Sequence, residues 1–460
     1  MDTGFIDHGA IYDYLKNTTP PDAKELADIL SHARELKGVS FAEAERLLMV
    51  EDDAHLDLIA DAARFIKEEI YGRRLVLFAP LYVSNLCNND CLYCAFKKSN
   101  ATLPRRTLAA DEIRREVQTL VQQGHKRILL VSGEGLGKNA LDYTVEAIET
   151  IYSVKMGKGE IRRINVNIAA LSVDGFRTLK AARIGTYQLF QETYHAQTYA
   201  KMHPSGPKSN YLFHLTAMDR AMEAGIDDVG VGVLFGLEDY RFEIMALLQH
   251  VRHLEERFGT GVHTISVPRL EPATGSDVSV NPPHPVSDRD FRKIISILRI
   301  TVPYTGMILS TRENAQMRRE ALSLGISQIS AGSRTNPGGY SDSDSAEQFS
   351  LGDHRSLEEV IRDIASMGHV PSFCTGCYRL GRTGHDFMDL AKPGLIKQYC
   401  LPNALTSFKE YLVNYATPET RAVGDALIAQ MLADIPGDAL RAKTAASLLQ
   451  IENGAVDLYV

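Results

Sequence analysis

The spacing of hydrophobic residues changes at about residue 74 of the chain. From Pro21 to Tyr71 these residues recur every three or four positions, which is the period of amphipathic helices. Ser40 precedes Glu43 at the distance of a helix N-cap and its capping box. We therefore expect an N-terminal helical extension at residues 1–73.

Short β-rich runs alternate with helical patterns after this point. The expected strands are Leu75–Ser84, Arg127–Ser132, Arg163–Ala169, Tyr187–Gln191, Val229–Phe235, His263–Leu270, Gly306–Ser310 and Ser327–Ala331. The helices expected between them include Ala110–Gln123, Ala140–Tyr152, Tyr211–Ala224, Phe242–Phe258 and Ser287–Leu298. Eight strands alternating with helices form a parallel sheet, and eight is the number that closes a barrel.

The pattern thus predicts an α/β fold, with a (β/α)8 TIM-type barrel at residues 74–340. An open doubly wound sheet is the alternative, and the lack of a Gly-x-Gly-x-x-Gly motif after the first strand weakens it. Beyond about Ser341 the strand pattern stops. We expect a mostly helical C-terminal domain at residues 341–460.

Composition narrows the class of protein. The 460 residues are 44% hydrophobic and 23% charged, which is a globular balance. A net charge of −8 and a pI near 6.0 argue against nucleic acid as a partner. No apolar run approaches the roughly 18–20 residues of a membrane span, and the first residues resemble no signal peptide. We expect a cytoplasmic protein with no membrane partner.

The six cysteines fall into two groups of three. In a reducing cytosol they are not expected to form disulfides, and scattered core cysteines would not sort in this way. The groups are Cys87, Cys91 and Cys94, then Cys374, Cys377 and Cys400.

The first triad follows the first predicted strand, at the barrel face where active sites form. Its Cys-x3-Cys-x2-Cys spacing supplies three thiolates, so that one iron of a four-iron cubane stays open. Structural zinc usually takes four ligands, and a redox Cys-x-x-Cys pair leaves Cys87 unexplained. The spacing, with Tyr93 before the last cysteine, resembles the signature of the radical S-adenosylmethionine (SAM) superfamily.

That resemblance implies further cofactor-binding residues. Gly133 and Glu134 end the second strand and resemble the element that contacts the methionine amino group of SAM. Gly232 and Gly236 end the fifth strand and resemble the glycine motif near the adenine. Tyr93 is expected to line the adenine pocket. Alone, each motif is more often an ordinary strand-to-helix turn.

The second triad has the spacing Cys-x2-Cys-x22-Cys and is expected to hold a second cluster. Zinc, completed by His385 or His369, is the alternative. Together the triads resemble the hydrogenase maturase G (HydG) family of radical SAM tyrosine lyases. Five other stretches resemble the same family: Tyr187–His195, Met202–Lys208, His263–Arg269, Ser330–Gly339 and Cys377–Gly384.

The resemblance implies cleavage of the Cα–Cβ bond of L-tyrosine to p-cresol and dehydroglycine. It also implies conversion of dehydroglycine to CO and cyanide at an auxiliary 4Fe-4S cluster, as a precursor for the active site of FeFe-hydrogenase. The family's extra, labile iron is bound by a histidine that matches His263 and by a free cysteine. The implied partners are SAM, tyrosine, an electron donor such as ferredoxin or flavodoxin, and downstream maturation proteins.

The position of His263 makes a geometric prediction. It begins the sixth strand, roughly 20 Å from the strand end that carries Arg269. If His263 binds iron, the second cluster lies at the N-terminal mouth of the barrel, and a channel joins the two sites. The C-terminal domain then passes under the barrel to deliver Cys374, Cys377 and Cys400.

Four charged residues at the other face are candidates for substrate or SAM contacts. Arg269, Arg312 and Glu192 are assigned to catalysis, and Arg334 to cofactor binding, because arginine pairs well with a carboxylate. Glu192 is a plausible partner for a ribose or an ammonium group, and Arg312 and Arg334 can equally form loop ion pairs. A 2-iminoacetate synthase of the ThiH type, which lacks the second triad, is the alternative enzyme. A non-enzymatic iron–sulfur scaffold is the alternative of another class.

Overall fold

Eight parallel strands close into a barrel, because β10 pairs with β1 as well as with β9. The structure is a computed structural model and describes residues 3–342 and 346–460. The barrel strands are β1 (Arg74–Ser84), β2 (Arg127–Ser132), β5 (Arg163–Asn167), β6 (Tyr187–Gln188), β7 (Val229–Gly232), β8 (Thr264–Ser266), β9 (Gly306–Leu309) and β10 (Gln328–Ser330). The predicted fold class and all eight predicted strands are confirmed.

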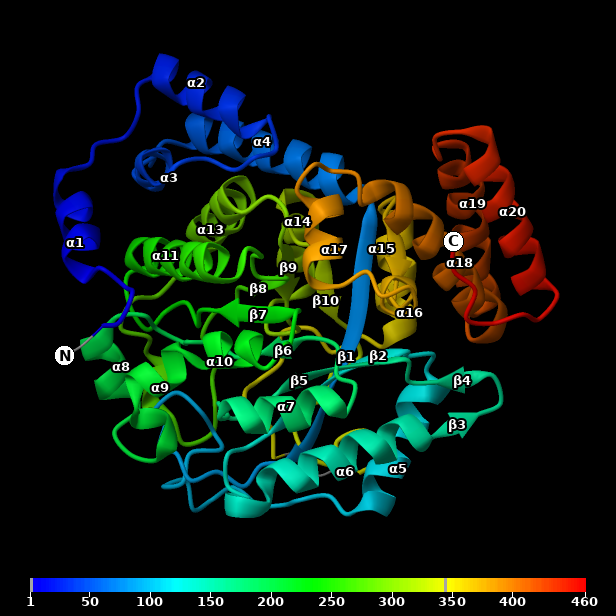
Figure 1. Cartoon of the computed structure of the whole chain (residues 1–460), viewed down its shortest axis with the longest axis horizontal. Coiled ribbons are helices and arrows are strands. Elements are labelled where there is room, and N and C mark those ends of the chain that lie inside the picture. The colour runs from blue at the N-terminus through cyan, green and yellow to red at the C-terminus, as the bar shows by residue number, and fades with distance from the viewer. Residues whose placement is uncertain (1–2, 343–345) are drawn as a thin grey trace.

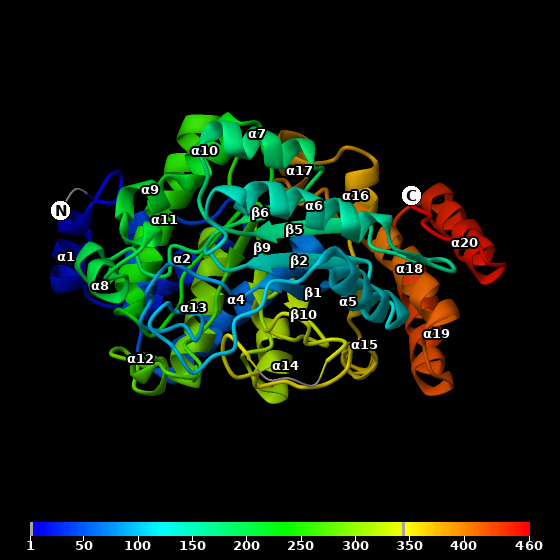
Figure 2. The ribbon, with the colours of Figure 1, turned by 90° about the horizontal axis from the view of Figure 1, so that it is seen from below.

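Helices surround the barrel (Figures 1 and 2). They are α5 (Ala110–Gln122), α6 (Ala140–Ser153), α7 (Val173–Ala181), α8 (Ala196–Met202), α9 (Tyr211–Leu215), α10 (Ala217–Glu223), α11 (Tyr240–Phe258), α12 (Asp277–Val280), α13 (Asp288–Thr301) and α14 (Ala315–Leu324). The predicted helix Tyr211–Ala224 is broken at Thr216, which was not expected. The Thr216 hydroxyl donates to the Leu212 carbonyl at 2.7 Å, and Arg220 Nη1 donates to the Thr216 carbonyl at 3.0 Å. Both bonds compete with the helix ladder.

The N-terminal helices pack on one side of the barrel (Figure 1). They are α1 (His8–Asn17), α2 (Ala23–Ala33), α3 (Phe41–Leu48) and α4 (Asp53–Tyr71). The predicted capping box of Ser40 and Glu43 is present at the start of α3. Helix α1 was not predicted. Asp7 caps it, and Ile11 and Tyr14 are buried.

The C-terminal segment contains α15 (Leu357–Ser366), β11 (Val370–Ser372), α16 (Gly376–Arg379), α17 (Gly384–Ala391), α18 (Lys397–Asn414), α19 (Pro418–Ala433) and α20 (Asp438–Glu452). The expectation that strands stop at Ser341 is wrong, because β11 pairs in parallel with the first residues of β1. Three residues that include a proline carry too little alternation to be recognised as a strand.

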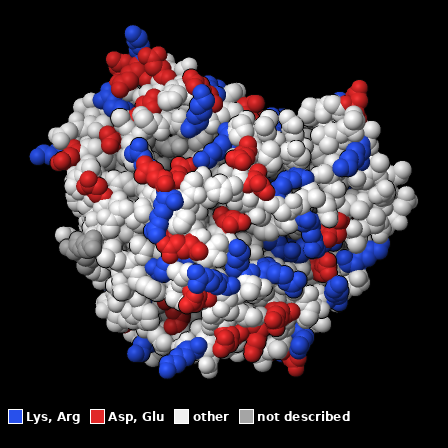
Figure 3. Space-filling model, in the orientation of Figure 1, with Lys and Arg blue, Asp and Glu red and all other residues white. Residues whose placement is uncertain are grey.

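A two-stranded hairpin, β3 (Lys155–Met156) and β4 (Gly159–Glu160), also went unpredicted. Lys and Arg side chains are interspersed with Asp and Glu on the face in Figure 3, so the net charge does not form one acidic surface there. Among the described residues, no helix is both long and apolar enough to cross a membrane.

Candidate functional site

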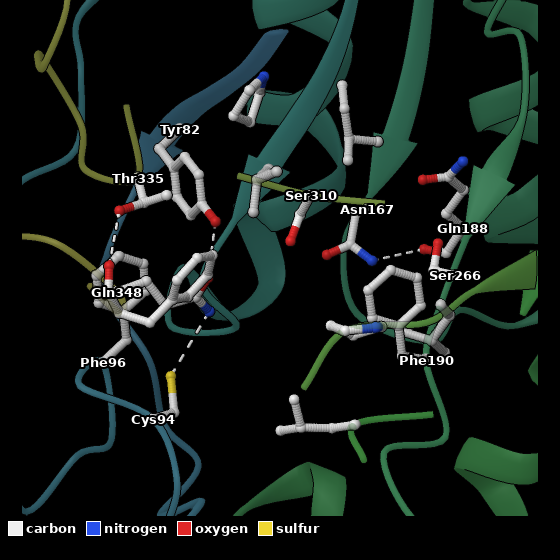
Figure 4. A pocket seen from close by; sticks show the side chains of 18 of the residues that line it. Tyr82, Cys94, Phe96, Asn167, Gln188, Phe190, Ser266, Ser310, Thr335 and Gln348 are labelled. Carbon is white, nitrogen blue, oxygen red and sulfur yellow. Dashed lines mark hydrogen bonds between the residues drawn. The ribbon is translucent and has the colours of Figure 1, made fainter. Parts of the chain in front are cut away.

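A cavity of about 200 Å³ opens at the carboxyl ends of the barrel strands. All three cysteines of the first triad line it, together with residues from most of the strands. Figure 4 shows Tyr82 and Gln348 on one side and Asn167, Gln188 and Phe190 on the other. Tyr82 Oη donates to Gln348 Oε1 at 2.7 Å, and Gln348 Nε2 lies 3.6 Å from Cys94 Sγ. A mixed polar and apolar cavity of this kind suits a small organic ligand.

Glycines let the loop after β2 contact the cysteine loop directly. A Cβ atom at Gly133 would lie 2.3 Å from the Leu86 carbonyl oxygen, and one at Gly135 would lie 2.4 Å from its carbonyl carbon. Gly206, with φ +95°, approaches Asn89 in the same way from a third loop. The sequence motif around Gly133 therefore has a steric reason as well as the expected role in binding.

Asn89 connects the cysteine loop to two charged residues. Its Nδ2 donates to Glu134 Oε2 at 2.7 Å, and its Oδ1 accepts from the Lys208 backbone at 2.8 Å. Lys208 Nζ in turn donates to Glu192 Oε1 at 2.8 Å. Glu192 has φ +67°, which is uncommon for a residue with a side chain. Lys208 lines the cavity but was not among the predicted site residues; its place in the Met202–Lys208 stretch was the only signal.

The thiols of the first triad lie in a nearly dry environment. Burial raises the pKa of Cys94 to about 11 and also raises the pKa values of Cys87 and Cys91. Thiolates at these positions need nearby positive charge, which a bound cluster supplies. Three thiols on one loop beside a cavity fit a four-iron cluster with one open iron. Among the described residues, no group of three or more His, Cys, Asp or Glu side chains is arranged so that it could hold a metal ion.

Two of the three predicted catalytic residues line the cavity. Glu192 does so from the end of β6, and Arg312 lies with its guanidinium 3.3 Å from the centre of the Phe349 ring. Arg269 is not among the lining residues. It pairs with Glu313 and, at 2.8 Å, with Asp288. The structure therefore shows Arg269 in ion pairs with two carboxylates and not in the cavity wall.

The predicted cofactor-binding residues are distributed in the same way. Tyr93 and the pair Gly133 and Glu134 line the cavity, and Tyr93 Oη lies 2.8 Å from His203 Nε2. Gly232 and Gly236 are absent from the lining. A Cβ at Gly232 would lie 2.7 Å from the Phe190 ring, so this glycine makes room for a residue that does line it. Arg334 is also outside, and its Nη1 donates to the Ser333 carbonyl.

The second triad lies at the opposite end of β1. Cys374 follows β11, which pairs with the first three residues of β1, whereas Cys87 follows the last. The eleven residues of β1 span about 30–35 Å. Cys377 is on α16 and Cys400 is on α18. Burial raises the pKa of the Cys377 thiol, and the nearby Cys374 and Cys400 raise it further. The structure thus separates the triads, as the position of His263 predicted.

His263 lies at this same end of the barrel. Its Nδ1 is 3.3 Å from Asp228 Oδ1, and its ring centre is 4.6 Å from that of Phe387. Burial lowers the pKa of His263 to about 4, so its ring is neutral at physiological pH. A neutral imidazole is the form that binds a metal. Asp228 beside Nδ1 leaves Nε2 as the nitrogen for such a bond.

Comparisons with known proteins identify the family of the chain. The radical SAM superfamily pattern matches residues 81–251, and the biotin and thiamin synthesis associated domain matches residues 266–370. A crystal structure of HydG, a maturase of the [FeFe]-hydrogenase, superposes with a TM-score of 0.96 at 51% identity and covers 99% of this chain and 100% of its own. HydG from Carboxydothermus hydrogenoformans gives 0.84 at 41%, covering 96% and 97%.

A more distant relative is the 2-iminoacetate synthase of Salmonella typhimurium, which is 33% identical over 69% of this chain and 82% of its own length. The barrel and the cysteine triad at the carboxyl end of β1 define a radical SAM protein. Within that superfamily the chain belongs to the HydG family of [FeFe]-hydrogenase maturases.

Proposed function

We propose that this protein is a tyrosine lyase that supplies CO and cyanide for hydrogenase maturation. The observation that carries the proposal is the separation of two cysteine triads to opposite ends of one barrel, with a cavity beside the first. Two separated triads match two consecutive reactions on one substrate. Similarity to two HydG structures over nearly the whole chain supports the same assignment.

In the first reaction, the cavity would bind SAM and L-tyrosine. Cys87, Cys91 and Cys94 would hold the cluster that, with SAM and an electron from ferredoxin or flavodoxin, supplies a radical for hydrogen abstraction at the tyrosine amino group. Arg312 would pair with a carboxylate, since its partly buried side chain lines the cavity and forms no ion pair with a carboxylate of the described residues. Breaking the Cα–Cβ bond yields p-cresol and dehydroglycine.

In the second reaction, dehydroglycine gives CO, cyanide and water. This step balances without an oxidant, because the anion HN=CH–COO⁻ contains the atoms of all three products. Cys374, Cys377 and Cys400, with His263, would hold an auxiliary cluster and an extra iron that collects the products with a free cysteine. Downstream maturation proteins would then receive this iron precursor.

Anaerobic turnover with tyrosine, SAM and dithionite tests the assignment. The wild type is expected to form p-cresol and CO, Cys91→Ser neither, and Cys377→Ser p-cresol without CO. The alternative 2-iminoacetate synthase, favoured by the 33% identical relative, would form p-cresol without CO in the wild type as well. An iron–sulfur scaffold would form neither product, and that result would refute the enzyme assignment.

A further inference from the structure

Three buried arginines lie at the N-terminal end of the barrel, away from the cavity described above. Arg74 begins β1, Arg127 begins β2 and Arg163 begins β5. Their exposed fractions are only 5%, 1% and 1%. Arginine is almost never this buried unless its N–H donors are paired with acceptors or an anion.

The partners of these arginines do not satisfy them. Arg163 is the best placed: its Nη2 lies 3.6 Å from Asp228 Oδ2, its plane stacks on the Tyr378 ring, and its Nη1 lacks an acceptor. Arg127 donates from Nη2 to the neutral Gln328 side chain at 3.0 Å, while its Nε and Nη1 donate to nothing. In residues 3–342 and 346–460, no carboxylate lies within 4 Å of Arg127 or Arg74.

A buried guanidinium with one neutral acceptor is costly, because desolvation of the charge is not repaid. The missing partner must be an anion other than a carboxylate of the described residues. Two sources are open: the thiolates and cluster of the second triad, or a small anionic ligand inside the barrel.

The strand register places Arg127 between the two functional sites. Leu129 and Ser330 line the cavity, and Arg127 and Gln328 each come two residues earlier on the same strands. Side chains two apart on a strand point to the same face, so the Arg127–Gln328 pair lies one layer, about 7 Å, below the cavity. Its position is therefore inside the barrel, towards the N-terminal mouth.

The second triad approaches the same layer from below. Val76 of β1 pairs on one side with Gln328 of β10 and on the other side with Ser372 of β11. Further along the side that pairs with β11, Ala79 of β1 pairs with Ile128 of β2. The end of β11, just before Cys374, therefore meets the start of β2 at Arg127.

We propose that Arg127, assisted by Arg163, binds the carboxylate of a two-carbon imino acid on its way from the first site to the second. The proposal rests on the proposed function, which supplies dehydroglycine as that carboxylate. Two guanidinium groups with free N–H donors match a carboxylate in charge and geometry. Arg74 is assigned to the cluster side, because it pairs with Val370 at the start of β11, the strand that leads to Cys374.

Product partition in the Arg127→Met variant tests the proposal. A fragment that is not retained reaches solvent, where water adds across its C=N bond and the C–N bond breaks to give glyoxylate and ammonia. We expect p-cresol to form as in the wild type, the ratio of CO to p-cresol to fall at least about tenfold, and glyoxylate to account for the difference. Arg127→Lys, which keeps the charge, is expected to lie between the two.

Equilibrium binding provides a readout that does not depend on turnover. Glyoxylate, the stable aldehyde counterpart of the imine, is the probe, and ¹³C NMR of labelled glyoxylate with the cluster-loaded protein measures it. Binding is expected to weaken at least about tenfold in Arg127→Met. Arg299→Lys is the matched control: Arg299 is equally buried, but its donors all reach carbonyl oxygens, so glyoxylate binding and the product ratio should not change.

Three results would overturn the proposal. The first is an unchanged ratio of CO to p-cresol in Arg127→Met. The second is loss of the auxiliary-cluster EPR signal in that variant, which would show that Arg127 only balances thiolate charge. The third is loss of p-cresol, which would place Arg127 in the first reaction. A wild type that forms no p-cresol would instead refute the proposed function itself.

Discussion

Lys208 Nζ donates to Glu192 Oε1 at 2.8 Å, and the two side chains are only 10% and 14% exposed. Burial alone lowers the pKa of Lys208, but Glu192 and the Cys91 thiol raise it above the ordinary lysine value. Lys208 therefore stays charged beside the first triad. A charged pair at the edge of a dry cavity can position an ionic cofactor or substrate.

Removing Lys208 should disable the first reaction. In Lys208→Met, Glu192 would remain buried without its partner, which costs about 3–5 kcal/mol for a buried pair. We expect p-cresol formation to fall at least about a hundredfold in Lys208→Met and much less in Lys208→Arg, which keeps the charge. Chromatographic assay of p-cresol, normalised to iron content, measures this. Wild-type turnover by Lys208→Met would show that the pair is only structural.

Adding a methyl group at Gly133 should displace the cysteine loop. The new Cβ would lie 2.3 Å from the Leu86 carbonyl oxygen, and backbone cannot move aside as a flexible side chain does. Gly133→Ala should lose most of the first-cluster EPR signal and p-cresol formation. Gly137→Asn is the control, because Gly137 has nothing within 4 Å and its φ of +61° is one that asparagine tolerates. Equal losses in both variants would contradict the steric argument.

The sequence predicted the elements that depend on neighbouring residues and missed those that depend on contacts distant along the chain. Strand alternation is local, so β1 and β2 were predicted to within one residue at each end. The pairing of β11 with Arg74, Leu75 and Val76 is a contact across nearly 300 positions that three residues cannot signal. The same reason explains why α9 and α10 were expected as one helix: the hydrogen bond of Arg220 to Thr216 depends on the folded side chain.

The candidate site was likewise predicted only in part. Cysteine spacing identified the two triads, because each contains a Cys-x2-Cys pair with a third cysteine that completes a set of three thiolates. Arg127 was missed, since a lone arginine at a strand start gives no pattern, and only its burial and unsatisfied donors set it apart. Arg269 was expected at the cavity from its strand position, but its guanidinium forms ion pairs with Glu313 and Asp288 instead.

His263 should matter for the second reaction alone. It lies at the opposite end of the barrel from Cys87, and burial keeps its ring neutral with a pKa of about 4. His263→Ala is expected to form p-cresol at the wild-type rate and to lose CO at least about tenfold, with loss of iron beyond that of the two clusters. Iron analysis and EPR spectroscopy of the resting protein measure this loss. A variant that loses p-cresol would contradict the separation of the two reactions.

Glu410 should control how firmly the C-terminal helices are held against the barrel. On α18, its carboxylate accepts from Arg162 Nη1 and Nη2 at 2.9 and 2.7 Å and lies 3.1 Å from Lys126 Nζ, with all three side chains almost fully buried. Burial raises the pKa of Glu410, but Lys126 and Arg162 overcome this and lower it to about 2. Glu410→Gln removes the carboxylate that pairs with buried Lys126 and leaves Arg162 with only the more distant Asp457 and Glu160, at 3.4 and 4.0 Å. The loss should destabilise the fold by about 3–5 kcal/mol.

The pH dependence of that loss follows from the lowered pKa. Because the folded carboxylate releases its proton at lower pH than the unfolded one, its contribution is complete above pH 4.5 and is lost as pH falls towards 2. The difference in free energy of unfolding between wild type and Glu410→Gln, from urea denaturation, should therefore shrink across that window. Glu419→Gln is the control: its carboxylate is 80% exposed and pairs with Arg362 at the surface, so it should cost under about 1 kcal/mol at any pH. A difference between Glu410→Gln and wild type that stays constant from pH 7 to pH 3 would mean that charge pairing at Glu410 does not hold these helices in place.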